Sequence, residues 1–586
     1  MLWKLSLTGI KNRLRDYIVL FSGLVMASAI FYMFESMASN EDFLNSNSMI
    51  AFTVIIFRLG SVLLGLITFV YILYANSFLM TMRQKDYAMF MMLGAKGRKI
   101  AQMIFSETFI VGIAATLVGS AVGIGLTSVV HQLLVEQLDI KISHFSPFNV
   151  HGLMITLLFF AVLFLLAAFV NAYSIVKKPI LTLIRSSQTP NKIKQRNILF
   201  FIEVIFGIVC LGIGYYMLAN VTSYQMIAIV VALVTIVVGT YFVFHSVIIF
   251  FLSLLKKTEK IALYKLNNFT LSQLTFRIRE YTQMLSMVAI LFALALGALT
   301  VGLGFRNEIS EMTKNATSYD LVLNNAQKID QAKITELSPT LNATYAQKED
   351  EKTIYYNYAQ FEEWPFEKIS AEDLSNKLEY QNELREYELP EQKEKEIKLL
   401  PQAEFEQLNL SQSSLQLIKV KNFEANLDAI KALVEANTQN NPSLQKEEFS
   451  ITQKYNAYET FNSLFSGLEF MGFFLGLAFL TMLASCLMFK ILSGSKSDIL
   501  RYEMLEKIGT RRKLLQQSIQ REVGVLFLIP GILGVIHVLF GLQMFKSLML
   551  NPYKDLWVPF TIFFVLYFVY YALTTWLYTG IVLKKK

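Results

Sequence analysis

The sequence contains one distinctive stretch twice: RQKDYAMFMMLGAKGRKIAQMIFSE at residues 83–107 and DILRYEMLEKIGTRRKLLQQSIQRE at residues 498–522. The two copies align without a gap at an offset of 415 residues. Identical residues at aligned positions include Tyr87 and Tyr502, Gly94 and Gly509, Gln102 and Gln517, and Glu107 and Glu522. Each copy follows one apolar run and leads into another. The stretch is therefore predicted to join two membrane helices through an amphipathic helix and a turn.

The two copies differ in the order of their charges. Arg83 and Asp86 of the first copy align with Asp498 and Arg501 of the second. An acid and a base three residues apart share one helix face in either order. Gly94 and Gly509 are predicted to end the amphipathic helices, since glycine is common just beyond a helix C-terminus.

The repetition bears on what the stretch does. One copy alone could be a juxtamembrane turn whose Lys and Arg side chains extend to the membrane surface. Two copies in register favour a shared mechanical role instead, and membrane transport proteins often carry duplicated halves.

Composition supports a membrane protein. The chain is 54% hydrophobic and only 17% charged, whereas soluble domains carry about 25% charged residues. Apolar runs of about 20 residues predict membrane-spanning helices. Ten such runs lie at 17–37, 51–78, 109–134, 153–176, 198–218, 226–254, 284–305, 470–489, 523–544 and 557–580.

Loop charge predicts the orientation of these spans. Basic residues gather before the first run, after every second run and at the C-terminus, and basic loops mark the cytoplasmic side. Both termini are therefore predicted in the cytoplasm. Residues 306–455 carry 27 acidic and 17 basic residues and are predicted outside. Because the basic residues flank apolar runs, a nucleic-acid partner is disfavoured.

The long insert has the character of a soluble domain. Residues 415–420 alternate as a strand does, and residues 423–436 have helical spacing of Leu, Ile and Val. The predicted fold class is an α-helical integral membrane protein with about ten spans and one α+β extracytoplasmic domain between spans 7 and 8. Its parts are a four-span unit (1–197), spans 5–7 (198–305), the domain (306–460) and a three-span unit (461–586).

Several kinds of chemistry have no motif in the sequence. GAKGRK at residues 94–99 lacks the spacing and the terminal hydroxyl of a phosphate-binding loop. We therefore expect no catalytic residues, no directly bound cofactor, and ATP use only by a partner subunit. The five histidines form no H-E-x-x-H motif, so no metal site is predicted.

Two polar residues at membrane depth are candidates for an intramembrane role, because such residues are costly there. They are Arg58 and His537. Arg58 could simply extend its side chain to the membrane surface, and the structural alternative for His537 is a packing role beyond Pro530.

The stretch YANSFLMTMRQKDYAMFMMLGAKGRKI (residues 74–100) resembles the FtsX-like, or MacB-like, permeases of ABC transporters. The sequence is also similar to the bacitracin- and lantibiotic-resistance (BceB-like) subgroup. Residues 498–537, DILRYEMLEKIGTRRKLLQQSIQREVGVLFLIPGILGVIH, carry that similarity. The insert matches no motif of the subgroup, so the ligand is left open.

The resemblance implies a permease of the cell membrane that works with a separate cytoplasmic ABC ATPase, in two copies. Its short cytoplasmic helices would be coupling helices, with Arg83, Asp86, Gly94, Asp498, Arg501 and Gly509 as the coupling residues. Further implied partners are membrane lipid, a membrane histidine kinase, and a peptide antibiotic or lipid-linked cell-wall precursor.

Two other hypotheses stay open from the sequence. In the first, the chain is a non-transport mechanotransmission subunit that regulates a wall hydrolase or a histidine kinase. In the second, it is an intramembrane enzyme, which would rest on Glu203 and His537 alone.

Overall fold

A computed structural model describes residues 14–39, 50–138, 146–176, 197–258, 260, 267–369, 376–446 and 452–583. The predicted cytoplasmic termini and the basic loop at 177–196 lie outside these residues. The chain divides into two compact units. We call them the helical unit, which includes residues 53–306 and 466–583, and the sheet unit, which includes residues 307–465.

Ten helices in the described part of the chain are long and apolar enough to cross a membrane, which confirms the ten predicted spans. They are α2 (Leu14–Ala38), α4 (Ile50–Met92), α5 (Gly97–Leu138), α6 (Val150–Val176), α8 (Asn197–Ala219), α9 (Val221–Phe242) with its continuation to Lys257, α13 (Thr282–Ala316), α19 (Lys454–Ser493), α21 (Arg512–Gly541) and α22 (Trp557–Val582).

The observed helices α5 and α21 are longer than the predicted spans. Each begins in the repeated stretch and continues into the apolar run without a break. Amphipathic and apolar segments can share one helix, because the backbone hydrogen bonds need no change at the boundary.

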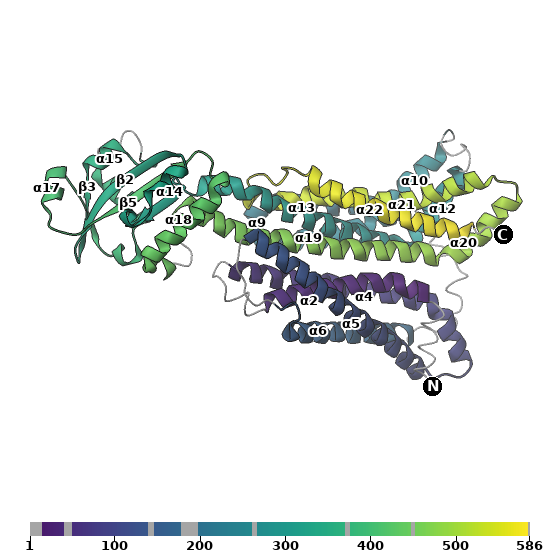
Figure 1. Cartoon of the computed structure of the whole chain (residues 1–586). Helices are drawn as coiled ribbons and strands as arrows, with labels where there is room; N and C mark the ends of the chain where they lie inside the picture. Colours follow the sequence, from purple (N-terminus) through teal and green to yellow (C-terminus); the bar gives the residue numbers. More distant parts are fainter. Residues whose placement is uncertain are drawn as a thin grey trace. The chain divides into compact units, whose positions relative to one another are not determined.

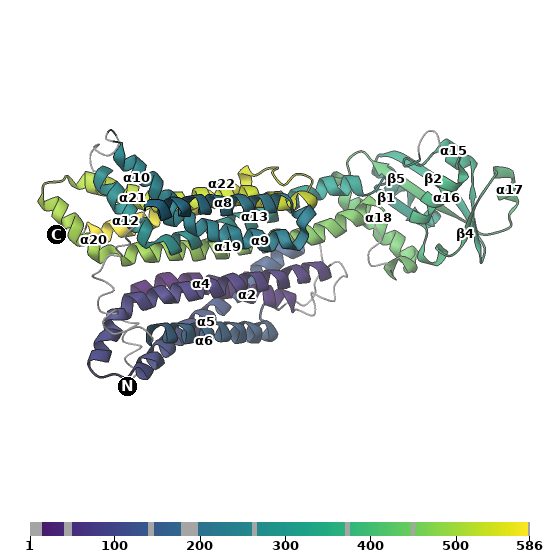
Figure 2. The same cartoon turned by 180° about the vertical axis from the view of Figure 1, so that it is seen from behind.

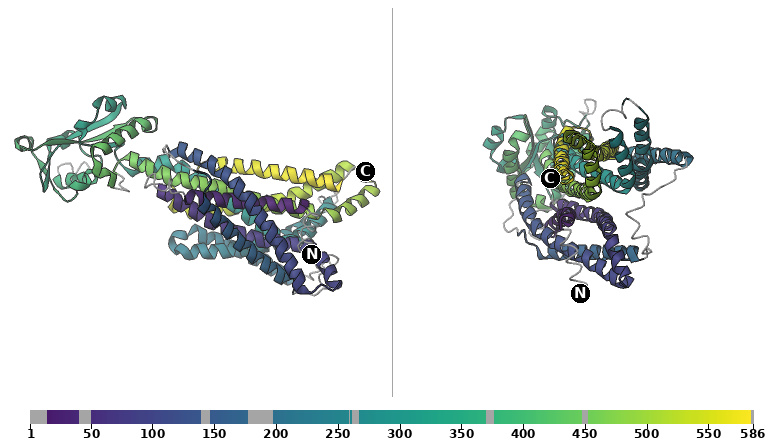
Figure 3. Two further views of the ribbon diagram at one scale, coloured as in Figure 1. Left: turned by 60° about the horizontal axis from the view of Figure 1, so that its bottom comes forward. Right: turned by 90° about the vertical axis from the view of Figure 1, so that its right-hand side faces the viewer.

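Helices α2, α4, α5 and α6 lie side by side (Figures 1 and 3). Gly119 of α5 permits a close approach to α2, since a Cβ there would lie 1.9 Å from Ser28 Oγ. The residue aligned with Gly119 at the offset of 415 is Gly534 of α21. A Cβ there would lie 2.3 Å from the ring of Phe292 on α13. Helix α13 thus approaches α21 at this position as α2 approaches α5 at the aligned one.

Helices α8 and α9 pack against each other (Figure 2), and their side chains expose much apolar surface. Phe201, Ile205, Val230 and Leu233 are each more than half exposed. A soluble monomer rarely shows a continuous apolar surface of this kind, whereas a helix that faces lipid does. The surface chemistry therefore agrees with the length of the helices.

The sheet unit contains one five-stranded sheet in the order β1-β5-β2-β3-β4 (Figure 1). The strands are β1 (Leu321–Asn324), β2 (Pro339–Glu349), β3 (Thr353–Asn357), β4 (Glu396–Leu400) and β5 (Gln412–Val420). Only β3 and β4 pair in parallel, and the other neighbours are antiparallel. In the longest ladder, Ala343 of β2 lies opposite Leu417 of β5.

A hydrophobic core covers each face of the sheet. Strand β5 contributes to both cores, because alternate residues of a strand point to opposite sides. Leu415 and Leu417 of β5 join an aromatic core that includes Tyr345 and Phe361. Ile418 and Val420 join a second core with α18 (Leu427–Asn440). The smaller helices are α14 (Gln331–Glu336), α15 (Ala359–Glu363), α16 (Lys377–Leu384) and α17 (Gln402–Gln407).

These elements confirm the predicted α+β fold of the insert. The predicted strand at 415–420 is part of β5. The predicted helix at 423–436 is α18, but it begins four residues later, at Leu427, because Glu424–Asn426 form a separate 3-10 turn.

Candidate functional site

The two copies of the repeated stretch fold into the same turn. Helix α4 ends at Met92 and α5 begins at Gly97. At the offset of 415, α20 (Ser495–Lys507) ends at Lys507 and α21 begins at Arg512. We call the segments 93–96 and 508–511 the first and second turns. The boundaries agree because the same capping interaction ends both helices.

That capping interaction is a Schellman motif. In the first turn, Ala95 N donates to Phe90 O over 3.0 Å, and Gly94 N donates to Met91 O. In the second turn, Thr510 N donates to Leu505 O over 3.1 Å, and Gly509 N donates to Glu506 O. The two glycines have φ of +91° and +93°, a region that other residues adopt at a cost. Backbone geometry therefore favours glycine at both positions.

Each turn exposes an aliphatic side chain at its tip. Leu93 is 82% exposed, and Ile508, at the aligned position, is 80% exposed. One helical turn earlier, Met89 and Met504 are also more than half exposed. Exposed cations follow at aligned positions, Lys96 with Arg511 and Arg98 with Lys513. Both turns thus present an apolar tip next to positive charge.

A buried ion-pair cluster lies behind each turn. In the first cluster, Arg83 of α4 forms an ion pair with Glu107 of α5, and both side chains are almost fully buried. Tyr87 donates to the same carboxylate over 3.4 Å, and the guanidinium of Arg83 lies 5.1 Å from the Tyr87 ring centroid. Asp86 is partly exposed and lies 3.8 Å from Arg83. The cluster joins the helices on the two sides of the turn.

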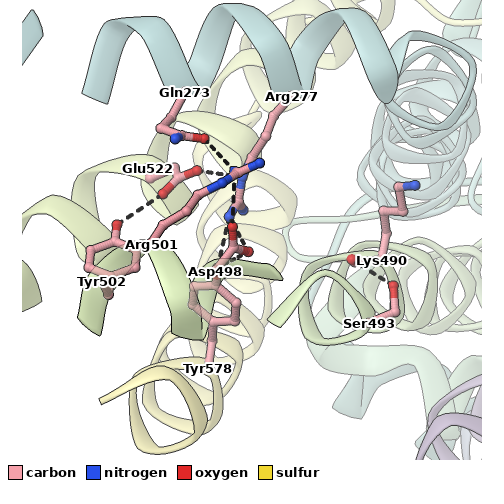
Figure 4. A network of polar contacts seen from close by, with 9 residues as sticks. All are labelled: Gln273, Arg277, Lys490, Ser493, Asp498, Arg501, Tyr502, Glu522 and Tyr578. Carbon is pink, nitrogen blue, oxygen red and sulfur yellow. Dashed lines mark hydrogen bonds and ion pairs between the residues drawn. The ribbon is translucent and has the colours of Figure 1, made fainter. Parts of the chain in front are cut away.

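The second cluster has the same glutamate and tyrosine but a different source of positive charge (Figure 4). Tyr502 donates to Glu522 over 3.3 Å, as Tyr87 does to Glu107. The guanidinium, however, belongs to Arg277 of α12 (Asn267–Glu280). Arg277 contacts Glu522 at 2.5 Å and Asp498 at 2.7 Å, and it donates to Tyr578 Oη of α22 over 2.8 Å.

Electrostatics keep Arg277 charged although its side chain is only 4% exposed. Burial by itself lowers the pKa of Arg277, but the carboxylates of Glu522 and Asp498 outweigh this and raise it well above its usual value. Burial also raises the pKa of Tyr502, and the neighbouring Glu522 adds to the effect. Tyr502 therefore stays a hydrogen-bond donor. One buried cation thus holds two acidic groups from α20 and α21 together.

The residues proposed from sequence fall into two groups. Gly94 and Gly509 form the turns, whereas Arg83 and Asp498 are buried inside the clusters. Asp86 and Arg501 lie at the cluster edges, with Arg501 bonded to Asp498 at 3.3 Å. None of the four charged residues is at a turn tip.

Three groups of residues were missed by the sequence reasoning: Arg277, Tyr578, and the exposed pairs Met89 with Met504 and Leu93 with Ile508. The alignment contained a signal for the first. An aspartate at the position of Arg83 requires a cation from elsewhere if the interior is to stay balanced.

The two intramembrane candidates have different surroundings. Arg58 is exposed on α4. His537 of α21 is buried, and both of its ring nitrogens have partners: Tyr215 Oη of α8 at 2.7 Å and Thr240 Oγ1 of α9 at 3.0 Å. These contacts join α21 to α8 and α9. Across the described ranges, no group of three His, Cys, Asp or Glu side chains is placed to hold a metal ion.

Comparison with known proteins agrees with this architecture. Residues 58–180, which include the first turn and its cluster, match the family described as FtsX-like permease C-terminal. The chain is 21% identical to the uncharacterised ABC transporter permease YvcS of Bacillus subtilis, over 98% of both chains. It is 22% identical to the bacitracin export permease protein BceB of B. subtilis, over 97% of both. It is 23% identical to the B. subtilis ABC transporter permease protein YxdM, over 95% of both.

The ten apolar helices and these relatives together support a multi-pass membrane protein. The chain contains an FtsX-like permease domain and is a homologue of bacterial ABC transporter permeases along nearly its whole length.

Proposed function

We propose that this chain is the permease subunit of an ABC transporter that protects the cell against wall-targeting peptide antibiotics such as bacitracin. The observation that carries the proposal is the pair of matched turns. Two copies of one exposed surface, 415 residues apart in sequence, suit two copies of one partner. A separate ATPase would supply that partner, and each ATPase copy would bind one turn.

The turns have the chemistry of a docking surface. An isolated exposed aliphatic side chain needs no explanation, but the same one repeated at aligned positions does. Leu93 and Ile508 would fill an apolar pocket on the ATPase. Lys96, Arg98, Arg511 and Lys513 would face acidic groups around that pocket.

In this proposal, the residues assigned to coupling from sequence divide the task. Gly94 and Gly509 shape the docking turns. Arg83, Asp86, Asp498 and Arg501 hold each turn rigidly to the helices beyond it. The sheet unit would lie outside the cell, as the charges of the loops favour. It would receive the movement through α13 and α19, which both contain residues of the two units.

The antibiotic part of the proposal draws on the relative whose name includes bacitracin export. A peptide antibiotic, or the lipid-linked wall precursor that it binds, would be the ligand. A membrane histidine kinase that reports the presence of antibiotic would be a further partner.

The test is co-expression of the tagged chain with an ABC ATPase from the same organism, in a host that lacks its own bacitracin transporter. We expect the wild-type chain to copurify with the ATPase and to raise the inhibitory concentration of bacitracin. The double variant L93D/I508D should lose both properties. L550D, at the loop between α21 and α22, is a matched control, because Leu550 is also exposed.

Retention of the ATPase by L93D/I508D would show that the turns are not the docking surface. A wild-type complex that binds the ATPase but gives no protection against bacitracin would favour the regulatory hypothesis instead. Kinase signalling measured in the same strains would separate those two functions.

A further inference from the structure

One polar face of helix α12 contacts α20 and α21, the helices on the two sides of the second turn. Asn267 accepts from Arg521 over 3.0 Å, and Thr270 lies 3.0 Å from Ser518 Oγ. Gln273 accepts from Arg501 over 2.9 Å, and Arg277 pairs with Asp498 and Glu522. These α12 residues are spaced by three, three and four positions, which places them on one side of a helix. Helix α12 therefore packs against α20 and α21 along its whole length.

Helix α12 is also nearly continuous with α13. Tyr281 is the one residue between them. Tyr281 N donates to Arg277 O over 2.7 Å, and Leu285 N donates to Tyr281 O over 2.8 Å. These are the bonds of an α-helix, four residues apart. Helix α13 then extends to Ala316, past residue 307, where the sheet unit begins. A displacement of α12 would act directly on the helix that leads into that unit.

The first cluster shows that a buried Glu–Tyr–Arg arrangement does not need a guanidinium from α12. There the arginine is on the helix that carries the turn, at the position of Asp498. In the second cluster, Asp498 and Glu522 both depend on Arg277, so α12 is included in the ion-pair network. The use of a third helix adds a connection.

We propose that Arg277 is a positioning residue that transmits movement of the second turn to α13, and through it to the sheet unit. This inference rests on the proposed function, in which an ATPase moves the turns. It assigns unequal tasks to the two turns, because Arg277 connects α12 to α20 and α21, the helices on the two sides of the second turn.

The test exploits the repeat. The triple variant R277Q/D498R/R501D gives the second cluster the charge order of the first, with an arginine on α20 next to Glu522. The cluster keeps a buried cation, but α12 loses its ion pairs. The variant and the wild type would be purified with the ATPase in nanodiscs. Hydrogen exchange would be measured with and without ATP plus vanadate, so no antibiotic is needed.

In the wild type, we expect nucleotide to change exchange both in α20 and in residues 307–316 of α13. In the triple variant, α20 should still respond, and the response of residues 307–316 should fall at least fivefold. An unchanged α13 response in the triple variant would overturn the inference, since packing alone would then suffice. A wild-type complex in which α20 responds and α13 does not would overturn it equally.

Two further variants serve as controls. R277K keeps the charge and therefore the fold, but an ammonium cannot reproduce the planar fork that reaches Asp498, Glu522 and Tyr578. An α13 response between those of wild type and triple variant is expected, and a response equal to wild type would contradict the role of the guanidinium. K257Q removes an exposed cation at the end of the helix that continues α9 and should match the wild type. Failure of the wild-type chain to bind any ATPase would instead reject the proposed function itself.

Discussion

The two copies of the repeated stretch have kept the same surface and changed their interior. Outside, the turns match in helix boundaries, in glycine φ and in the exposed Leu93 and Ile508. Inside, the Glu–Tyr pair is kept, but the arginine comes from α4 in one copy and from α12 in the other.

The difference follows from what each region must satisfy. A surface that meets the same partner twice must keep its shape and chemistry residue by residue. A buried cluster must only keep its charges paired and its polar atoms bonded, and any helix within reach can provide the cation. Four measurements test whether the two copies differ in this way.

The largest effect is expected from removing the buried guanidinium. R277M leaves Asp498 and Glu522 without their shared cation, and R83M leaves Glu107 without its arginine. Losing one partner of a buried ion pair costs about 3–5 kcal/mol. We expect R277M at the upper end of this range and R83M at the lower end, as measured by the thermal unfolding midpoint of the purified permease. K257M is the exposed control, and a larger loss for R83M would argue against the comparison.

The next largest effect concerns the turn tips. L93D and I508D should each weaken ATPase binding by about 2 kcal/mol, or roughly 30-fold, which is typical of losing one buried aliphatic side chain. The first should cost more, because Leu93 follows exposed Met92 whereas Ile508 follows Lys507. Affinity would be measured with the permease in nanodiscs. If neither variant changes the affinity, the matched exposure has no role in docking.

A smaller loss of stability is expected at Gly119 and Gly534, the glycines that allow two helices to approach closely. In G119A, the new Cβ would meet Ser28 Oγ at 1.9 Å and the backbone oxygen of Val25 at 2.7 Å. In G534A, it would meet only atoms of the Phe292 side chain within 3.0 Å, and a side chain can shift more easily than a backbone oxygen. Overpacking costs about 1–3 kcal/mol, so G119A should destabilise the permease more. The reverse order in thermal unfolding would show that α13 packs more rigidly than α2.

The smallest effect is expected at the turn glycines. G94A and G509A place a side chain at positive φ with no atom within 4 Å of the new Cβ. Only backbone strain is left, at about 1–2 kcal/mol for each residue. Because the two φ values nearly coincide, the two losses in thermal stability should be equal. G125A, in α5 with open space around it, is the control, and unequal losses would mean that the turns are not equivalent.

Much of this architecture could be predicted because it depends on neighbours in sequence. Apolar run length predicted the ten spans, and glycine at aligned positions predicted where α4 and α20 end. Strand alternation at residues 415–420 and helical spacing at residues 423–436 predicted two elements of the sheet unit.

The clusters could be predicted only in part. The alignment paired Leu93 with Ile508, but exposure depends on what packs nearby. Arg277 is 221 residues from Asp498 in sequence, and no local pattern separates it from the other basic residues of its loop. For the same reason, Arg83 and Asp498 were assigned to coupling without any indication that they are buried.

The sequence alone therefore determined the number of spans, the two turns and the α+β insert, since hydrophobic length, periodicity and glycine conformation act over a few residues. The tertiary structure alone decided which cation neutralises Glu522 and Asp498, and which aliphatic side chains stay exposed. Ion pairing and burial depend on distance in space, and the chain brings α12, α20, α21 and α22 together only when it folds.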